Sequence, residues 1–395
     1  MLFLPISLGM ENNETVCACA LGKVFGYEPR IALSLVENLG SAAAVFALTQ
    51  RERDELLGPY SKYSGTLTDA LVEEAAQELS DLEQQGCRYL PLCDPAFPEA
   101  LRECGDPPTG LYYRSSSPPE EIFRPRPAIA IVGTRDMSPY GKEWCARIVG
   151  ALSQAPEKPV IVSGLAFGID ITAHMAALGH GLSTIAVLPN GIEMVYPHSH
   201  TVAAGKIAAS EGSALVTDFP PGTGPVGFTF LRRNRIIAAL SSATILIESK
   251  KHGGGLITAE LAVGYGREVF ALPGRIDDLR SEGCNLLIRE KKAEPIVNLA
   301  EVGRQVGLGS YNLRGRKGFM AKVEDFYKDA PNNRISLILR IAEAIHRQRG
   351  VSVDELCSAL ALPYPDVSTT VLTLESDGLI STDLMGRCTV NLSTV

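Results

Sequence analysis

The chain has 395 residues, of which 45% are hydrophobic and 21% are charged, and its formal net charge is -8 at pH 7. This length and composition indicate a soluble globular protein of two or three domains. The acidic balance argues against a protein covered with basic surface, although a local basic patch would still allow nucleic-acid binding. No apolar run approaches the ~20 residues of a membrane helix, and no basic leader marks a signal peptide, so we expect no membrane association.

The nine cysteines are scattered along the chain, and only Cys17 and Cys19 are close in sequence. No CxxC pair and no partner-histidine spacing suggests a zinc site. We therefore expect no metal, and free thiols in a reducing compartment, the cytoplasm.

Residues 1–82 are predicted to form a helical domain. Apolar residues recur at helical spacing from Ile31 to Val36, and the stretch from Leu67 to Leu82 is amphipathic with a charged face. Gly40 breaks the pattern, and Ser41 is a possible N-cap for the helix that follows.

Residues 83–299 are predicted to form an α/β core. The first part, up to about residue 127, has short runs with turn signals and ends in a proline-rich linker. Beyond it, strands and helices alternate, which is typical of a doubly wound parallel sheet. Ser138 followed by Pro139 predicts the start of the first helix. The expected strands are residues 128–132, 159–163, 184–188, 214–219, 243–248 and 268–272.

The last part of the chain is predicted to be a linker, residues 300–334, and a small domain, residues 335–395. The linker is polar, is interrupted by glycine and carries Arg314, Arg316 and Lys317. Three short helical patterns and a possible hairpin over 379–392 then indicate a winged-helix-like domain.

Glycine-bearing turns follow the expected strands and are the most informative feature of the chain. Glycine lets backbone N–H groups approach a ligand closely, and a helix that starts just after the turn adds partial positive charge. In a parallel sheet such turns line one crevice at the carboxyl ends of the strands, so we expect an anion site, with phosphate as the anion. The turns are 133–135, 163–170, 189–191, 253–255 and 273–275.

Cationic side chains accompany several of these turns. Arg135 is placed at the mouth of the expected crevice, with Ser138 three residues further on. Phe230 precedes three arginines at the start of a helix, where cations oppose the helix dipole, and an external anion would explain this arrangement. Lys250 and Lys251 precede the fourth turn, and Arg275 closes the fifth.

Catalytic patterns are weak, so we expect neither catalytic residues nor a cofactor. Asp170 and His174 share a helix face near Ser163, but no G-x-S-x-G surrounds this serine, and we expect His174 to pack or cap locally. The chain has no GxxxxGK[ST] loop and no standard dinucleotide fingerprint.

Taken in order, these motifs resemble the DNA-processing protein A family (DprA, also called Smf). The resemblance runs from Val132 to Ile288 with matching spacing, and Asp94-Pro95-x-Phe97-Pro98 and Asp106-Pro107-Pro108 also match what precedes that family's core. The matching motifs are Val132-Gly133-Thr134-Arg135 with Ser138, Ser163-Gly164-x-Ala166-x-Gly168-Ile169-Asp170 with His174, Arg233-Asn234-Arg235-Ile236-Ile237, Val269-Phe270-Ala271-x-Pro273-Gly274, and Gly283-x-Asn285-x-Leu287-Ile288.

The resemblance implies an extended Rossmann-like core that binds single-stranded DNA, forms a homodimer, protects incoming DNA and helps to load RecA recombinase during natural transformation. It also implies a sterile-alpha-motif-like N-terminal domain and a winged-helix-like C-terminal domain. Two departures concern Phe167, at a position that is basic in some members, and the turn 253–255, which replaces a serine-containing turn. The DNA-binding residues expected from the turns and the resemblance together are Gly133, Thr134, Arg135, Ser138, Gly164, Gly168, Asp170, Phe230, Arg232, Arg233, Asn234, Arg235, Lys250, Lys251, Gly255 and Arg275.

Two alternative functions stay open on the sequence. Residues 253–260 loosely resemble the glycine-threonine-glutamate motif of nucleotide phosphoribohydrolases, but two residues separate Gly255 from Thr258, where that family has glycine directly before threonine. A winged-helix transcription regulator is the other alternative. Its expected recognition helix near 367–374 contains no arginine or lysine, which disfavours tight duplex binding.

Overall fold

The computed structural model describes residues 10–58, 60–308, 320, 323–328, 330–347, 350–383 and 386–390. The chain divides into two compact units, Met1–Val306 and Gly307–Val395. The boundary expected near residue 82 lies inside the first unit and stays a prediction, as does the linker 300–334. Arg314, Arg316 and Lys317 lie outside the described residues. Among the described residues, no helix is long and apolar enough to cross a membrane.

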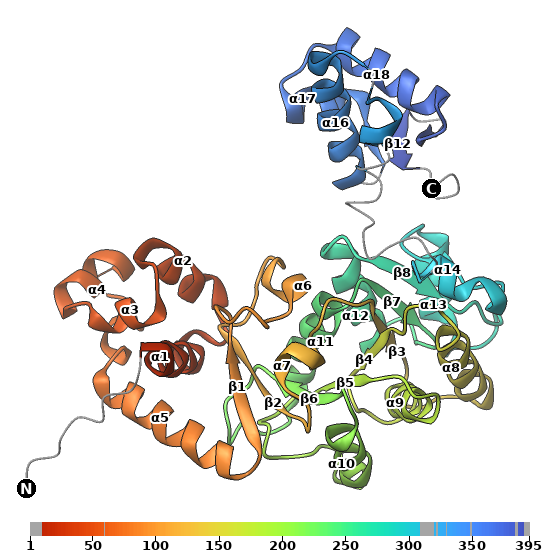
Figure 1. The fold of residues 1–395 in the computed structure, drawn as a ribbon. Coiled ribbons are helices and arrows are strands. Elements are labelled where there is room, and N and C mark those ends of the chain that lie inside the picture. The colour runs from red at the N-terminus through yellow and green to blue at the C-terminus, as the bar shows by residue number, and fades with distance from the viewer. Residues whose placement is uncertain are drawn as a thin grey trace, which may run out of the picture. The chain divides into compact units, whose positions relative to one another are not determined.

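The first unit begins with the expected helices, which Figure 1 shows in red and orange. Gly40 ends α2 with a φ of 90°, and the Ser41 hydroxyl caps α3 by accepting a hydrogen bond from the Ala44 N–H, so the predicted break is confirmed. The apolar faces of these helices share one buried cluster with Ala186, Leu188 and Leu215 of the sheet region. The elements are α1 (Met10–Phe25), α2 (Pro29–Leu39), α3 (Ala42–Ala47), α4 (Gln50–Leu57), η1 (Ser64–Thr66) and α5 (Asp69–Gln84).

Nine strands of the described residues form one sheet in the order β1-β2-β6-β5-β4-β3-β7-β8-β9. The strands from β3 to β9 pair in parallel, as expected for a doubly wound fold. The antiparallel strands β1 and β2 extend the sheet at one edge, within a region where only turn signals were recognised. The strands are β1 (Cys87–Pro91), β2 (Gly110–Arg114), β3 (Ala128–Val132), β4 (Val160–Ser163), β5 (Thr184–Val187), β6 (Ala214–Thr217), β7 (Ala243–Leu246), β8 (Glu268–Ala271) and β9 (Glu294–Pro295).

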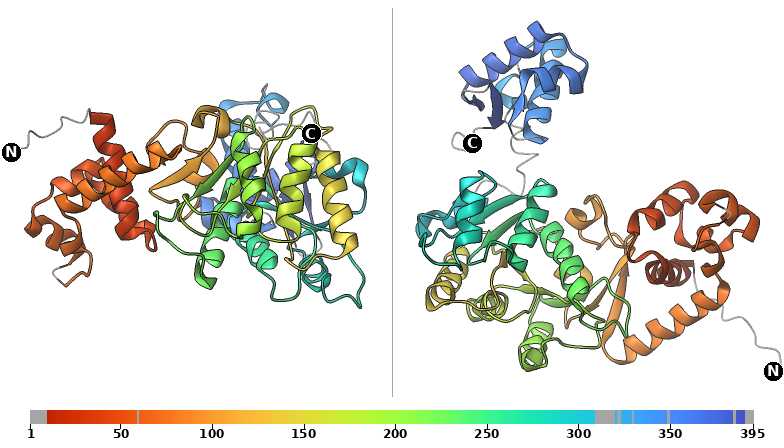
Figure 2. Two further views of the ribbon diagram at one scale, coloured as in Figure 1. Left: turned by 90° about the horizontal axis from the view of Figure 1, so that it is seen from below. Right: turned by 180° about the vertical axis from the view of Figure 1, so that it is seen from behind.

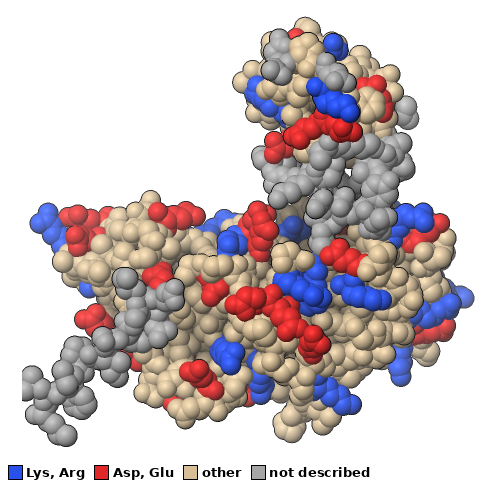
Figure 3. Space-filling model, viewed as in Figure 1, with Lys and Arg blue, Asp and Glu red and all other residues tan. Residues whose placement is uncertain are grey.

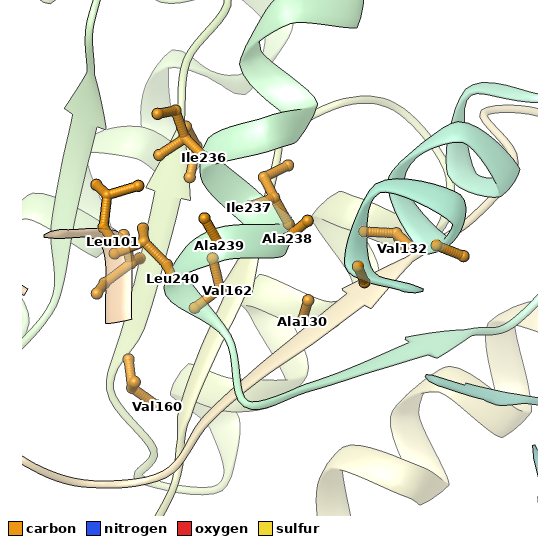
Figure 4. Packing of buried hydrophobic residues seen from close by; sticks show 14 of the residues in the cluster. Leu101, Ala130, Val132, Val160, Val162, Ile236, Ile237, Ala238, Ala239 and Leu240 are labelled. Carbon is orange, nitrogen blue, oxygen red and sulfur yellow. The ribbon is translucent and has the colours of Figure 1, made fainter. Parts of the chain in front are cut away.

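Helices cover both faces of the parallel sheet (Figures 1 and 2). On one face, α11 packs its last turns on alternate residues of β3 and β4, and Figure 4 shows Ala239 and Leu240 next to Val162. α8 and α9 lie on the opposite face. The helices are α6 (Glu99–Arg102), α7 (Pro119–Ile122), α8 (Pro139–Leu152), α9 (Ile169–Gly179), η2 (His198–His200), α10 (Thr201–Ala209), α11 (Gly227–Leu240), α12 (Gly254–Gly264), α13 (Glu282–Arg289), η3 (Leu299–Glu301) and α14 (Val302–Gln305).

The second unit has its own buried cluster, built around Ile341, Leu356 and Leu374. Its described elements are α16 (Asn332–Arg347), β10 (Val351–Ser352), α17 (Val353–Leu360), α18 (Tyr364–Ser376), β11 (Ile380–Thr382) and β12 (Arg387–Val390). The strands form an antiparallel sheet in the order β10-β12-β11. The expected helices and hairpin are therefore present, and the assignment as a winged helix stays a prediction.

Candidate nucleic-acid interface

The strand order switches between β3 and β7: the chain adds β4, β5 and β6 on one side of β3, and then β7, β8 and β9 on the other. Ligands of doubly wound proteins bind at such a switch point. The turns that follow these two strands are in backbone contact. A Cβ atom on Gly255 would lie 2.8 Å from the Cα of Gly133, so no larger residue fits at position 255 without movement of the turn. The Thr134 N–H donates a 2.7 Å hydrogen bond to the carbonyl oxygen of Glu248. The two turns thus form one continuous wall.

The turn after β4 packs on the same wall through Gly168. This residue has a φ of 77°, and a Cβ atom on it would lie 2.3 Å from the carbonyl oxygen of Thr134. The Ile169 N–H, at the start of α9, donates to the same oxygen at 3.2 Å. The turns after β3, β4 and β7 therefore converge as predicted, and some of their backbone N–H groups are used to hold the turns together.

Arg233 ties the turn after β4 to the end of β5 from beneath. It is 3% exposed, and its Nη1 donates to the carbonyl oxygens of Gly164, at 2.6 Å, and Val187. Burial lowers the pKa of Arg233 to about 10, so the guanidinium stays charged at neutral pH. Burial also raises the pKa of Asp170, and the charge of Arg233 and a hydrogen bond to the Ala166 backbone offset only part of this rise. Arg233 and Asp170 therefore shape the site from beneath.

The expected DNA contacts of Arg232 and Arg235 need correction. Arg235 is 6% exposed and donates to the carboxylate of Asp218 and to the carbonyl oxygen of Asp106. The Arg232 side chain is 11% exposed and lies 3.8 Å from the same Asp218 carboxylate. The cations that oppose the dipole of α11 are thus balanced by an internal carboxylate, so they do not require an external anion. Asn234, 7% exposed, donates to the Gly254 carbonyl oxygen at 3.4 Å.

Ser138 is also committed within the protein. Its hydroxyl donates to Glu248 Oε1 at 2.5 Å and accepts from the Gly141 N–H at 3.1 Å, which confirms it as the N-cap of α8. The Ser138 N–H donates to Glu248 Oε2 at 2.9 Å. Since the hydroxyl hydrogen is used and a carboxylate is adjacent, this side chain is poorly placed to bind phosphate, contrary to the expectation from sequence.

The exposed cations near the wall are Arg135, Lys250, Lys251 and Arg275. Arg135 lies over the ring of Phe230, with its Cζ atom 4.5 Å from the ring centroid, and the Tyr196 ring lies 5.6 Å from Phe230. Arg275 forms a two-point ion pair with Asp277 at 2.7 and 2.9 Å. Arg135 is therefore a charged group that an aromatic ring orients at the mouth of the crevice.

His174 packs locally, as expected. It is fully buried, its Nε2 accepts from the Leu165 N–H at 3.3 Å, and its Nδ1 lies 2.7 Å from the Thr184 hydroxyl. Burial lowers the pKa of His174 to about 3. A neutral histidine with both ring nitrogens in use holds the turn after β4.

Several residues of the site were missed on the sequence. Glu248 is the second residue after β7 and is 1% exposed, so its role in holding Ser138 required knowledge of the fold. The rings of Tyr27 and Tyr196 lie next to Phe228 and Phe230 of α11 but come from distant segments of the chain. Phe228 could have been found from the sequence, because it lies only two residues before Phe230.

The surface is not covered by charge of one sign. Figure 3 shows lysine and arginine side chains interspersed with aspartate and glutamate on the face it displays. No cluster of three or more metal-binding side chains occurs within the part of the chain that the structure describes. The site therefore offers local cations, glycine backbone and aromatic rings as its chemistry.

Comparison with known proteins gives consistent results. Residues 88–307 match the family DNA recombination-mediator protein A. Protein Smf of Synechocystis is 30% identical over 403 residues, which cover 94% of this chain and 98% of that protein. DNA processing protein DprA of Streptococcus pneumoniae is 36% identical over 243 residues, covering 60% of this chain and 83% of that protein. The X-ray structure of DprA from the same species superposes with a TM-score of 0.60 at 29% identity and covers 74% of this chain and 97% of that one.

The family match spans the whole parallel sheet together with β1 and β2, and it includes every turn of the crevice. The Synechocystis relative extends the similarity over nearly the full length of both proteins. The chain therefore belongs to the DNA recombination-mediator protein A family, as the sequence motifs had indicated.

Proposed function

We propose that the chain binds single-stranded DNA at the crevice formed by the turns after β3, β4 and β7. The observation that carries this proposal is the exposed Arg135 guanidinium, stacked over Phe230 beside a wall of glycine backbone. Such a site suits a phosphate together with an unstacked base, because arginine pairs with phosphate and an aromatic ring stacks on any base. The exposed Lys250 and Lys251 add charge on the β7 side.

The proposal predicts a preference for single strands over duplex with little dependence on sequence, because the groups at the crevice address the backbone and base faces rather than base edges. Fluorescence anisotropy with oligothymidylate, mixed-sequence strands and blunt duplex measures this preference. The affinity should fall as salt rises, since bound counterions are released. Equal affinity for blunt duplex, or an affinity independent of salt, would count against the proposal.

Replacing Arg135 by alanine should weaken single-strand binding by roughly 1–3 kcal/mol, the scale of a charge-assisted hydrogen bond. Arg147→Ala is a matched control because Arg147 also stacks on an aromatic ring, that of Trp144 at 4.6 Å, but lies in α8, eight residues beyond the start of that helix. The control should bind like the parent. If both variants bind like the parent, Arg135 does not contact DNA.

We further propose that the protein acts without catalysis in the cytoplasm, as a homodimer that protects incoming single strands and passes them to RecA recombinase during natural transformation. Membership of a recombination-mediator family supports this role. Two crevices on one strand would gain affinity through effective concentration, which favours pairing of two copies. Light scattering should then report about twice the chain mass of 42.3 kDa. A strict monomer that coats long strands tightly would contradict the dimer.

A further inference from the structure

A second aromatic cluster lies beside the first turn of α11, on the side away from Arg135. The Tyr27 and Phe228 rings are 5.6 Å apart with an interplanar angle of 45°. Tyr27 comes from the turn between α1 and α2, whereas Phe228 is the second residue of α11. The two residues are 59% and 58% exposed, and the neighbouring Val226 and Leu231 are 58% and 48% exposed. Single exposed apolar residues are common, but a contiguous group marks an interaction surface.

The cluster is held in a defined position. Arg232 donates from Nη1 to the Tyr27 carbonyl oxygen at 3.3 Å, and its guanidinium lies 5.0 Å from the Tyr27 ring. Asp218, largely buried, pairs with the same guanidinium. On the other side, the Phe25 ring is fully buried and anchors the turn that carries Tyr27. The exposed ring faces are therefore fixed before any ligand arrives, which limits the entropy lost on binding.

The first turn of α11 separates the cluster from the crevice. Phe228 and Phe230 are two residues apart, so they project from opposite sides of the first turn of α11. Phe230 lies beneath Arg135 on the crevice side, and Phe228 faces Tyr27 on the side of the N-terminal helices. The acidic neighbour Glu28 is bonded to the Tyr63 hydroxyl and to Lys62. A strand that leaves the crevice across α11 would therefore meet aromatic rings next.

We propose that Tyr27 and Phe228 form a second base-stacking platform, through which the N-terminal helices take part in binding single-stranded DNA. This inference rests on the proposed function of the crevice. Exposed aromatic faces accept any base, and Arg232, itself paired with Asp218, holds the Tyr27 ring in place. A strand long enough to pass α11 should use both the crevice and the platform, whereas a strand that fills only the crevice should not reach Tyr27.

The test compares a short and a long oligothymidylate, of about 5 and 20 nucleotides, a range that brackets the site sizes of single-strand binders. Tyr27→Ala and Phe228→Ala should each weaken binding of the long strand by about 5- to 150-fold, the loss of one stacked base, and leave the short strand unchanged. Tyr60→Ala is the matched control, since Tyr60 is a 98% exposed tyrosine of the same helical region. Tyr27→Phe, which keeps the ring, should bind like the parent.

A direct measurement uses long strands carrying 5-iodouracil, which cross-links to neighbouring aromatic rings under light. Peptide mass spectrometry should identify Tyr27 or Phe228 with the long strand and neither of them with the short one. If the parent binds both strands, the alanine variants bind the long strand equally well and no cross-link forms, the platform is refuted while the crevice stands. If the parent binds neither strand, the proposed function falls, and this inference falls with it.

Discussion

Gly168→Ala should both destabilise the first unit and weaken single-strand binding. Gly168 has a φ of 77° and a ψ of -121°, a region that residues with a Cβ atom rarely adopt. The added methyl group would lie 2.3 Å from the carbonyl oxygen of Thr134 and 2.8 Å from that of Arg135. Both neighbours are backbone atoms, so the turn that carries Arg135 has to move.

The expected loss of unfolding free energy has two parts. The backbone strain costs about 1–3 kcal/mol, and displacement of packed atoms costs a further ~1–3 kcal/mol. The variant should therefore lose about 2–6 kcal/mol in total, the sum of these two ranges. Gly181→Ala separates the two parts, because Gly181 has a φ of 68° but no heavy atom within 4 Å of the point that a Cβ atom would occupy. That control should lose only about 1–2 kcal/mol.

Urea unfolding followed by tryptophan fluorescence measures the stability of the first unit, because Trp144 in α8 is the single tryptophan of the chain. Fluorescence anisotropy with oligothymidylate, measured without urea, gives the single-strand affinity of the folded protein. The reasoning is refuted if Gly168→Ala loses no more stability than Gly181→Ala and binds DNA like the parent. Loss of binding in both variants would show that the contact with Thr134 and Arg135 is not the cause.

Three further outcomes are expected. The pKa of His174 is lowered from 6.5 to about 3, so below pH 6.5 the unfolded chain takes up a proton that the native chain excludes. The free energy of unfolding should therefore fall by about 2 kcal/mol from pH 7 to pH 5. Urea unfolding at a series of pH values should show that this free energy depends less on pH in His174→Gln. Asp218→Ala leaves Arg235 buried without its carboxylate and should cost about 3–5 kcal/mol, measured in the same way, whereas a neutral effect would contradict the ion pair. A chain ending at Val306, where the first compact unit ends, should keep most of its single-strand affinity by anisotropy; complete loss from a folded truncation would assign DNA binding to the second unit.

Much of the fold was predictable because its signals are local. The apolar runs at residues 128–132 and 243–248 were found as strands, since a buried parallel strand is continuously apolar. The cap at Ser138 and the break at Gly40 depend on one or two residues each. β1 and β2 were missed because prolines and turn residues dominate that region, and these strands are defined by antiparallel pairing with each other and with β6.

The sequence by itself determined the alternation of strands and helices, the glycine turns at the strand ends and, through the spacing of its motifs, the family. Only the tertiary structure decided which charged groups face solvent. Arg135 and Arg235 look alike in sequence, but Arg135 is exposed over Phe230, whereas Arg235 is buried against Asp218, a partner 17 residues away. A side chain's availability to a ligand depends on contacts between distant segments. No local pattern records those contacts, because charge balance in a folded protein is reached across space rather than along the chain.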